Sequence, residues 1–392
     1  MMKMESAVII DAVRTPMGRG KPGGSLAEIN AVDLLAQTLS ALMARNDVDP
    51  AAVDDVVTGC VSQAGEQAGT PGRFAWLAAG LPEHVPGVTI DRRCGSGQQA
   101  VDYAAWAIMA GAQDIVVACG VESMSRVPMG VARMGVDPFA PAAHRYPPGL
   151  VPQGISAELI AAKWRLSRED QDRYAVESHH RAAAAATAGA FDNEIVAVKD
   201  GDRVVKTDET IRPDTSEAKL AGLKPAFYDD GYAQRFPDIA WTVTAGNSSQ
   251  ITDGAAALLI TSESTANRLG LTPLARLLSF ATAAEDPVTM LAAPIPAARK
   301  ALQRAGLAID DIARYEVNEA FATVPLAWQQ ELDADPDKLN PVGGAIALGH
   351  PLGASGARIM TTLVHGLRPG EYGLQTMCEN GGMANATILQ RL

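Results

Sequence analysis

The sequence has few cysteines, and their arrangement predicts neither a metal centre nor a disulfide framework. Only four occur among 392 residues, far apart at positions 60, 94, 119 and 378, and no CxxC pair is present. Structural zinc sites and disulfide-rich folds need closely spaced or paired cysteines. Isolated thiols are most often inert core residues, so a functional role for any one of them needs further support.

Basic runs and long apolar runs are also absent. The formal net charge is −12, and no Lys/Arg cluster of the kind that follows a phosphate backbone occurs, so we expect no nucleic-acid partner. No apolar stretch approaches the roughly 20 residues of a membrane-spanning helix, so we expect no membrane partner. The expected location is the cytoplasm.

Three common nucleotide and hydrolase signatures are missing as well. No GxGxxG follows an early strand, no GxxxxGK[ST] occurs and no GxSxG occurs. A Rossmann dehydrogenase, a P-loop enzyme and a serine hydrolase of the nucleophile-elbow type are therefore excluded.

What is present is an alternation of strand and helix patterns. Helical spacing of apolar residues covers 34–42 and 101–109, and Ser167 with Asp170 could cap a further helix. This alternation predicts an α/β layered fold with mostly parallel or mixed sheets, and the length predicts two or three packed units. Short apolar runs that predict buried strands lie at 8–13, 85–90, 115–120, 255–261 and 372–377.

The two ends of the chain resemble each other. VDDV at 53–56 and IDDI at 309–312 each follow a helical pattern, at an offset of 256 positions. The same offset places Cys94 on His350, and each opens a glycine-rich turn before an apolar helix. Two duplicated halves would bring Cys94 and His350 together as pseudo-symmetric neighbours. Residues 123–250 have no counterpart in the repeat, which indicates an inserted lid or ligand-covering domain.

Four side chains are candidates for chemistry. Cys94 should lie at a helix N-terminus, which lowers a thiol pKa, although a buried cysteine beside a turn is the alternative interpretation. Histidine is the usual partner of a nucleophilic cysteine, and small residues surround His350. Cys378 ends a predicted strand before a flexible turn. Asn318 follows another strand and could orient a water or a side chain, or simply cap the strand.

Further short segments recur in order along the chain. They are VRTP at 13–16, RCGSG at 93–97, GVESMS at 120–125, GISAE at 154–158, TAGNSS at 244–249, NEAF at 318–321, GGAIALGHP at 343–351 and Cys378. Together these segments resemble the thiolase family along nearly the whole chain. The resemblance implies the duplicated, five-layered αβαβα thiolase fold with an inserted loop domain. The implied boundaries are 1–122 for the N-terminal half, 123–250 for the inserted domain, 251–270 for the return to the first half and 271–392 for the C-terminal half.

The resemblance also implies the roles of the site residues. Cys94 is the nucleophile, His350 activates it, and Cys378 exchanges a proton with the α carbon of acetyl-CoA. His350 and a water held by Asn318 stabilise the enolate, and the backbone N–H groups of Cys94 and Asn380 form an oxyanion hole.

Coenzyme A is implied as a substrate, without a metal or another cofactor. The expected partners are CoA and acyl-CoA, with dimers or tetramers of the chain. Residues implied to contact the pantetheine or acyl group are Ala245, Ser249, Phe227, Phe321 and Met290.

The chain departs from the family pattern around the acyl group. Asn380 stands where family members usually carry glycine. Asparagine tolerates a left-handed backbone better than other non-glycine residues, so we expect activity to survive. Pro152 and Gln153 replace a His-Met pair of short-chain biosynthetic members, and the residues after Met290 are not glycines. These features favour degradative bacterial 3-ketoacyl-CoA thiolases, acting in fatty-acid or steroid-type β-oxidation, over biosynthetic acetoacetyl-CoA thiolases.

Two other classes of protein fit the sequence less well. A ketoacyl synthase shares the layered fold and a nucleophilic cysteine, but Cys378 argues against it. A non-catalytic acyl-CoA or sterol-binding relative would lack one of the two cysteines or the histidine, and all three are present.

Overall fold

The structure is a computed structural model that describes residues 5–392. The first half of its central sheet is built from the N-terminal part of the chain. β1 (Ala7–Arg14), β5 (Ile115–Ser123) and β8 (Thr252–Ser262) are buried along their whole length, as their apolar runs predict. β8 pairs antiparallel with β1 and β5, and β5 pairs parallel with β3 (Asp55–Gly59).

The strand predicted at 85–90 is shorter and less buried than expected. β4 (Gly87–Ile90) pairs in parallel with β3 and lies at the end of the strand order. Val88 is 45% exposed, because an edge strand is covered by a neighbour on one side only. Val85 is buried, but it lies before the strand begins.

The second half of the sheet repeats the pairing pattern of the first. β10 (Ile312–Val317) pairs parallel with β11 (Tyr372–Glu379), and β12 (Met383–Arg391) pairs antiparallel with β11 and with β9 (Ala275–Ala284). The first half has the same order. There β3 pairs parallel with β5, β5 pairs antiparallel with β8, and β8 pairs antiparallel with β1. A short antiparallel contact between β1 and β9 joins the halves. The predicted duplication is confirmed.

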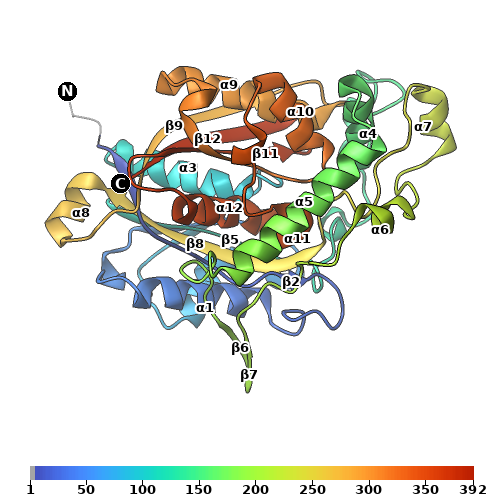
Figure 1. Ribbon diagram of the computed structural model, residues 1–392. Helices are drawn as coiled ribbons and strands as arrows, with labels where there is room; N and C mark the ends of the chain where they lie inside the picture. Colours follow the sequence, from blue (N-terminus) through green and yellow to red (C-terminus); the bar gives the residue numbers. More distant parts are fainter. Residues whose placement is uncertain (1–4) are drawn as a thin grey trace.

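Two helices lie between the halves of the sheet. α3 (Ser96–Met109) and α12 (Leu352–Gly366) pack against each other there, as Figure 1 shows. Their first residues, Ser96 and Leu352, are 256 positions apart, which is the offset of the sequence repeat. The segments that carry Cys94 and His350 therefore enter the same central layer from equivalent positions.

Outer helices complete five layers, as predicted. α1 (Ala31–Ala44) and α2 (Pro71–Ala78) cover the first half of the sheet. α9 (Pro294–Ala305) covers β9 and β12 of the second half, with α10 (Thr323–Leu332) beside it (Figure 1). The layering follows because each sheet face needs an apolar cover.

The segment between β5 and β8 adds helices at one end of the layers (Figure 1). α5 (Arg168–Thr187) begins with the predicted capping box, in which Ser167 and Asp170 bond reciprocally. The other elements of this segment are α4 (Gln153–Trp164), β6 (Val198–Asp200), β7 (Arg203–Val205), α6 (Glu217–Ala221) and α7 (Asp230–Arg235). The remaining short elements of the chain are β2 (Gly18–Arg19), α8 (Glu263–Leu269), α11 (Ala345–Leu348) and single 3₁₀ turns at Pro50–Ala52, Gly65–Gln67, Val131–Arg133, Ala140–Ala142, Met290–Ala292, Ile309–Asp311 and Pro336–Lys338.

Glycines allow the two central helices to approach at the level of their backbones. A Cβ on Gly356 of α12 would lie 2.1 Å from the backbone nitrogen of Gln98 on α3. A Cβ on Gly97 of α3 would lie 2.7 Å from the backbone nitrogen of Ala357 on α12. Such a contact holds the turns at the two helix starts at a fixed separation.

We expect Gly356→Ala to lower the free energy of unfolding by about 1–3 kcal/mol, because backbone rather than a movable side chain blocks the new methyl group. Urea unfolding would measure the change. The control is Gly222→Ala, where the nearest atom to a Cβ is 3.7 Å away, and a change within about 0.5 kcal/mol is expected. Equal stability of the two variants would contradict the close approach.

Candidate active site

One cavity brings several of the predicted site residues together. It measures about 280 Å³, and Cys94 and His350 both line it. A second cavity of about 80 Å³ is lined by Cys94 and Asn380. The predicted proximity of Cys94 and His350 is therefore confirmed, and the two cavities meet at Cys94.

The turn that carries Cys94 has an unusual backbone. Arg93, directly before it, has a φ of 49°, in the left-handed region that non-glycine residues seldom adopt. Ser96 holds this turn, because its Oγ donates to the Arg93 carbonyl at 2.6 Å and accepts from the Arg92 N–H at 2.8 Å. Sequence reasoning missed this strain, which is typical of functional sites.

The expected low pKa of Cys94 is wrong. Burial raises the pKa of the Cys94 thiol, and the nearby Cys378 and Glu379 raise it further. The position before α3 matches the prediction, but desolvation of a sulfur that is only 5% exposed outweighs the helix N-terminus. Cys94 is therefore a thiol at neutral pH and needs a base to become a nucleophile.

Hydrogen bonds of its backbone N–H fix the position of His350. Its N–H donates to the Gln250 carbonyl and to Thr252 Oγ1, each at 3.1 Å. Gly349 before it has a φ of 89°, and a Cβ there would lie 2.2 Å from Thr252 Oγ1. Glycine is thus required beside the histidine, both for its φ and for the lack of space.

Hydrogen bonds determine which imidazole nitrogen carries the proton. Ser355 Oγ donates to the Pro351 carbonyl at 2.8 Å, so its oxygen accepts from Nδ1–H of His350 at 2.6 Å. Nε2 then bears a lone pair, and it is buried with no hydrogen-bond partner among residues 5–392. Sequence reasoning treated Ser355 only as a small residue that clears space, and missed this contact.

The imidazole is uncharged at neutral pH. Burial lowers the pKa of His350 to about 3, and the positive charge of Arg358 contributes. A neutral imidazole with a free Nε2 lone pair can accept a proton. The site therefore pairs an un-ionised thiol with a nearby base.

Cys378 lies near the end of β11, opposite Ala384 of β12, as the strand pattern predicts. Asn318 Nδ2 donates to its sulfur at 3.7 Å, while Asn318 Oδ1 is buried without a partner in the described part of the chain. The asparagine thus contacts the second thiol directly.

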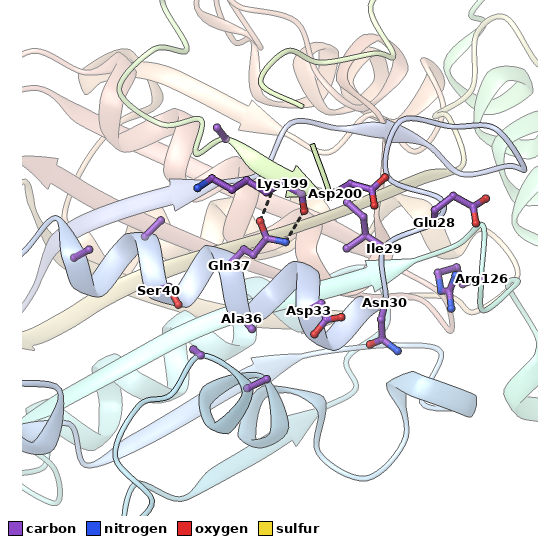
Figure 2. A pocket seen from close by; sticks show the side chains of 16 residues that line it. Glu28, Ile29, Asn30, Asp33, Ala36, Gln37, Ser40, Arg126, Lys199 and Asp200 are labelled. Atoms are coloured by element: carbon purple, nitrogen blue, oxygen red, sulfur yellow. Dashed lines mark hydrogen bonds between the residues drawn. The ribbon is translucent and has the colours of Figure 1, made fainter. Parts of the chain in front are cut away.

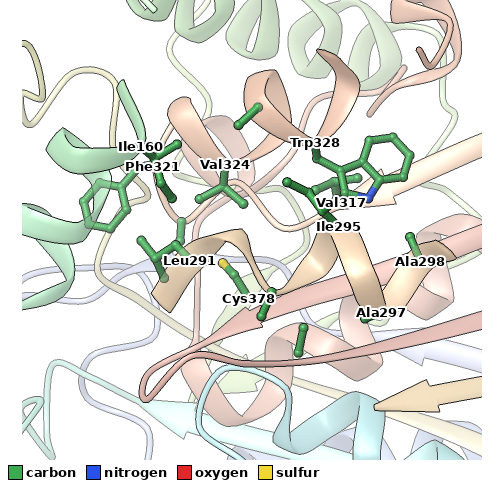
Figure 3. Packing of buried hydrophobic residues seen from close by; sticks show 14 of the residues in the cluster. Ile160, Leu291, Ile295, Ala297, Ala298, Val317, Phe321, Val324, Trp328 and Cys378 are labelled. Atoms are coloured by element: carbon green, nitrogen blue, oxygen red, sulfur yellow. The ribbon is translucent and has the colours of Figure 1, made fainter. Parts of the chain in front are cut away.

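The surroundings of Cys378 are apolar. Its side chain belongs to the large buried cluster that contains Leu291 and Val317 (Figure 3). Burial raises the pKa of Cys378 to about 11, and the Asn318 hydrogen bond opposes this shift. A thiol in such surroundings holds its proton at neutral pH, and its thiolate is a strong base.

Asn380 does not need its tolerance of a left-handed backbone. The positive φ values of this turn fall on Gly381, at 92°, and Gly382, at 80°. Because the glycines that follow provide the special conformations, asparagine fits at position 380 without strain. Its side chain is half-buried and lines the smaller cavity.

The residues predicted to contact substrate divide into two groups. Phe227, Ser249 and Phe321 line the larger cavity, and the two phenylalanine rings pack edge to face with centroids 5.8 Å apart. Ala245 is exposed and Met290 is 2% exposed within the core, and neither lines these two cavities.

Glu122 is a buried carboxylate that sequence reasoning did not single out. Its two oxygens accept from the N–H groups of Val61, Ser62 and Gly353 at 2.9–3.0 Å. It therefore ties the loop after β3 to the first turn of α12, close to His350. The available signal was an acidic residue within an otherwise apolar strand.

A larger hollow lies away from all of these residues. It measures about 790 Å³, between α1 and the start of the β6–β7 hairpin, and Figure 2 shows Gln37 and Lys199 bonded across it. Its lining includes none of the predicted site residues. Cavity size alone would therefore point to the wrong part of the molecule.

No group of three or more His, Cys, Asp and Glu side chains among residues 5–392 could hold a metal ion. In the same range, no helix combines the length and apolar character needed to cross a bilayer.

Comparisons with known proteins identify the family of this chain. Residues 7–264 match the N-terminal thiolase domain, and residues 271–391 match the C-terminal thiolase domain. The steroid 3-ketoacyl-CoA thiolase FadA6 of Mycobacterium tuberculosis is 50% identical over 99% of this chain and 95% of its own length. A 3-ketoacyl-CoA thiolase of Yersinia enterocolitica is 46% identical over 99% of this chain and its own full length.

Solved structures lead to the same family. The acetyl-CoA acetyltransferase of Bacillus anthracis has a TM-score of 0.88 and 37% identity, with both chains covered in full. The dimeric peroxisomal thiolase of Saccharomyces cerevisiae has a TM-score of 0.91 and 35% identity, covering 100% of this chain and 99% of its own. Since both family domains together match nearly the whole chain, it belongs to the thiolase family of acyltransferases.

Proposed function

We propose that this enzyme cleaves 3-ketoacyl-CoA with CoA, in the degradative direction, through an acyl group on Cys94. The observation that carries the proposal is the free Nε2 lone pair of His350 in the same cavity as Cys94. The thiol is un-ionised and the imidazole is uncharged, so one proton transfer creates the nucleophile.

In the first step, the Cys94 proton passes to Nε2 of His350 and the thiolate attacks the 3-keto carbon. The bond between C2 and C3 then breaks, and its electron pair goes to C2. Cys378 donates its proton to C2, which releases acetyl-CoA and leaves a thiolate on Cys378. The raised pKa of Cys378 supports this role, because a strongly basic thiolate can also remove a proton from carbon in the reverse direction.

In the second step, CoA takes the acyl group. Its thiol gives a proton to the Cys378 thiolate and attacks the thioester carbonyl on Cys94. The Cys94 thiolate leaves and recovers its proton from His350. Every group thereby returns to its starting state, and the cycle uses coenzyme A as a substrate without a metal or redox cofactor.

Negative charge develops on oxygen at two places. Backbone N–H groups of Cys94 and Asn380 are proposed to stabilise the tetrahedral intermediates, which is supported because both residues line the smaller cavity. His350 and Asn318 are proposed to stabilise the enolate oxygen of the acetyl unit. The pantetheine arm is proposed to pass Phe227, Ser249 and Phe321, which line the larger cavity.

We propose a substrate with a larger acyl group than acetoacetyl-CoA. Two relatives carry names that contain 3-ketoacyl-CoA thiolase, one of them with a steroid substrate. The second cavity at Cys94 supports this choice, since it adds space at the nucleophile and is not lined by Phe227. Cytoplasmic location and assembly into dimers or tetramers are further proposals, the latter supported by the dimeric yeast structure.

The test is CoA-dependent cleavage of a series of 3-ketoacyl-CoAs with acetyl, medium-chain, long-chain and ring-bearing acyl groups. We expect kcat/KM to be lowest for acetoacetyl-CoA and to rise with acyl size. Mass spectrometry after mixing with substrate, before CoA is added, should detect the acyl group on the peptide that contains Cys94. A preference for acetoacetyl-CoA would favour the biosynthetic alternative, and no turnover of any substrate would refute the proposed activity.

A further inference from the structure

The carboxyl group of Glu379 is buried between the turns of the two cysteines, and the mechanism above leaves it unused. Glu379 follows Cys378 directly and is 0% exposed. Both carboxyl oxygens lack a hydrogen-bond partner within the described chain. An ionised carboxylate in this situation would carry a large desolvation cost, so an explanation is needed.

The carboxyl group packs on the residue that follows the nucleophile. A Cβ on Gly95 would lie 2.0 Å from Glu379 Oε1 and 3.1 Å from Asn385 Oδ1. Asn385 Nδ2 donates to the Gly95 carbonyl at 3.3 Å, and Asn385 Oδ1 is itself a buried acceptor without a partner in residues 5–392. The acceptor oxygens of Glu379 and Asn385, which both lack hydrogen-bond partners in residues 5–392, therefore lie beside Gly95.

A proton on Glu379 would resolve this arrangement. An ionised carboxylate offers only acceptors, and no group of residues 5–392 donates to either Glu379 oxygen. A protonated carboxyl carries a smaller desolvation cost in the same surroundings. The geometry thus favours the uncharged form of Glu379.

The charged groups around Glu379 agree with this form. Burial raises the pKa of Glu379 to about 8, Arg92 lowers it, and Asp102 and Asp91 raise it. Arg92 and Asp91 lie on the loop before Cys94, and Asp102 lies on α3. Burial and the two acidic neighbours thus raise the pKa of Glu379 by more than the single arginine lowers it.

We propose that Glu379 is a positioning residue of the active site, whose uncharged carboxyl holds the Gly95 turn and whose ionisation works against thiolate formation at Cys94 and Cys378. A negative charge at this place opposes both thiolates, in keeping with the raised pKa of each cysteine. The pKa of each of the two thiols therefore depends on whether Glu379 carries its proton. The inference rests on the proposed function only in that these thiols perform the reaction.

The test compares wild type with Glu379→Gln, which keeps the shape of the side chain and an N–H donor but cannot ionise. The rate of alkylation of Cys94 by iodoacetamide, resolved by peptide mass spectrometry, is measured from pH 6 to 10. We expect the Gln variant to react faster at alkaline pH, with a profile displaced to lower pH by about half a unit, or about threefold in thiolate fraction. Superimposable profiles of two folded proteins would overturn the proposal.

A matched control is Asp102→Asn, a buried carboxyl whose pKa burial raises to about 7 and which hydrogen-bonds Thr387. Asp102 is not among the main charges that act on either cysteine, and it affects them only through Glu379, so a smaller displacement is expected. If the Gln variant does not fold, infrared titration of wild-type protein tests the same point. A protonated carboxylic acid must be detected there at pH 7, and its absence refutes the proposal.

Alkylation needs no turnover, so the two proposals can fail separately. A displaced profile in a protein that cleaves no 3-ketoacyl-CoA would refute the proposed function alone. Normal cleavage with an unchanged profile would refute the role of Glu379 alone. The pH dependence of kcat/KM gives a second measure, in which the Gln variant should retain more of its activity at alkaline pH than wild type does.

Discussion

Cys94→Ala is expected to lower kcat for 3-ketoacyl-CoA cleavage by about 10⁴-fold or more, as removal of a covalent nucleophile does in other enzymes. Without the sulfur, the acyl group has no atom to which it can be transferred, although the substrate still fits the cavity. The measurement is loss of the magnesium-enolate absorbance of a 3-ketoacyl-CoA, with KM determined where activity remains.

The matched control is Cys119→Ala. Cys119 is also buried, and its sulfur contacts Thr58 Oγ1 at 3.2 Å, but it lines neither cavity at Cys94. We expect kcat to change by less than about threefold in this variant, with some loss of stability from the missing packing. Comparable loss in both variants would mean that the effect comes from folding, and retained activity in Cys94→Ala would exclude the acyl-Cys94 intermediate.

The second large effect is expected for His350→Asn, with a loss of about 10²–10⁴-fold in kcat/KM, which is the usual contribution of general acid–base catalysis. Asparagine can keep a donor toward Ser355 but has no lone pair equivalent to Nε2. Iodoacetamide alkylation of Cys94 should slow in the same variant, because the base that removes the thiol proton is missing.

Ser355→Ala distinguishes the base from the group that orients it. The imidazole remains, but the contact that places the proton on Nδ1 is lost, so a smaller decrease than for His350→Asn is expected. The double variant should lose little more than His350→Asn alone, because the two side chains act as one unit. Additive losses would contradict that coupling.

Lowering the pH should reduce the free energy of unfolding through protonation of His350. Its folded pKa of about 3 lies below the unfolded value of about 6.5, so the unfolded chain binds more protons between these limits. The contribution of His350 to stability is therefore complete above pH 6.5 and is lost progressively as the pH falls toward 3. The neutral imidazole is retained across the pH range in which thiol chemistry operates.

Burial of both cysteines explains why the site needs a base at all. At an exposed helix N-terminus Cys94 would ionise without help, and it would also react with oxidants. Desolvation instead keeps Cys94 and Cys378 protonated, so in the proposed mechanism a proton must be transferred before either sulfur reacts. The thiolates then exist only during the reaction.

The sequence by itself determined the family, the duplicated layers and the pairing of Cys94 with His350. The family came from the resemblance of motifs such as RCGSG and GGAIALGHP. The duplicated halves and the pairing depend on local patterns: apolar runs that predict strands, and a repeat at an offset of 256 that places equivalent turns before equivalent helices. The turn segments of Cys94 and His350 are short, so their predicted proximity needed only the correct topology.

Only the tertiary structure decided the protonation and the fine geometry of the site. The pKa of Cys94 depends on how much water is excluded by distant segments, and sequence position indicated the opposite direction. The role of Ser355 depends on a hydrogen bond 2.6 Å long. The Glu379 carboxyl oxygens lack hydrogen-bond partners among residues 5–392 because of how the surrounding segments pack. Desolvation and hydrogen bonding are set by contacts between residues far apart in the chain, and these contacts exist only after the halves have packed.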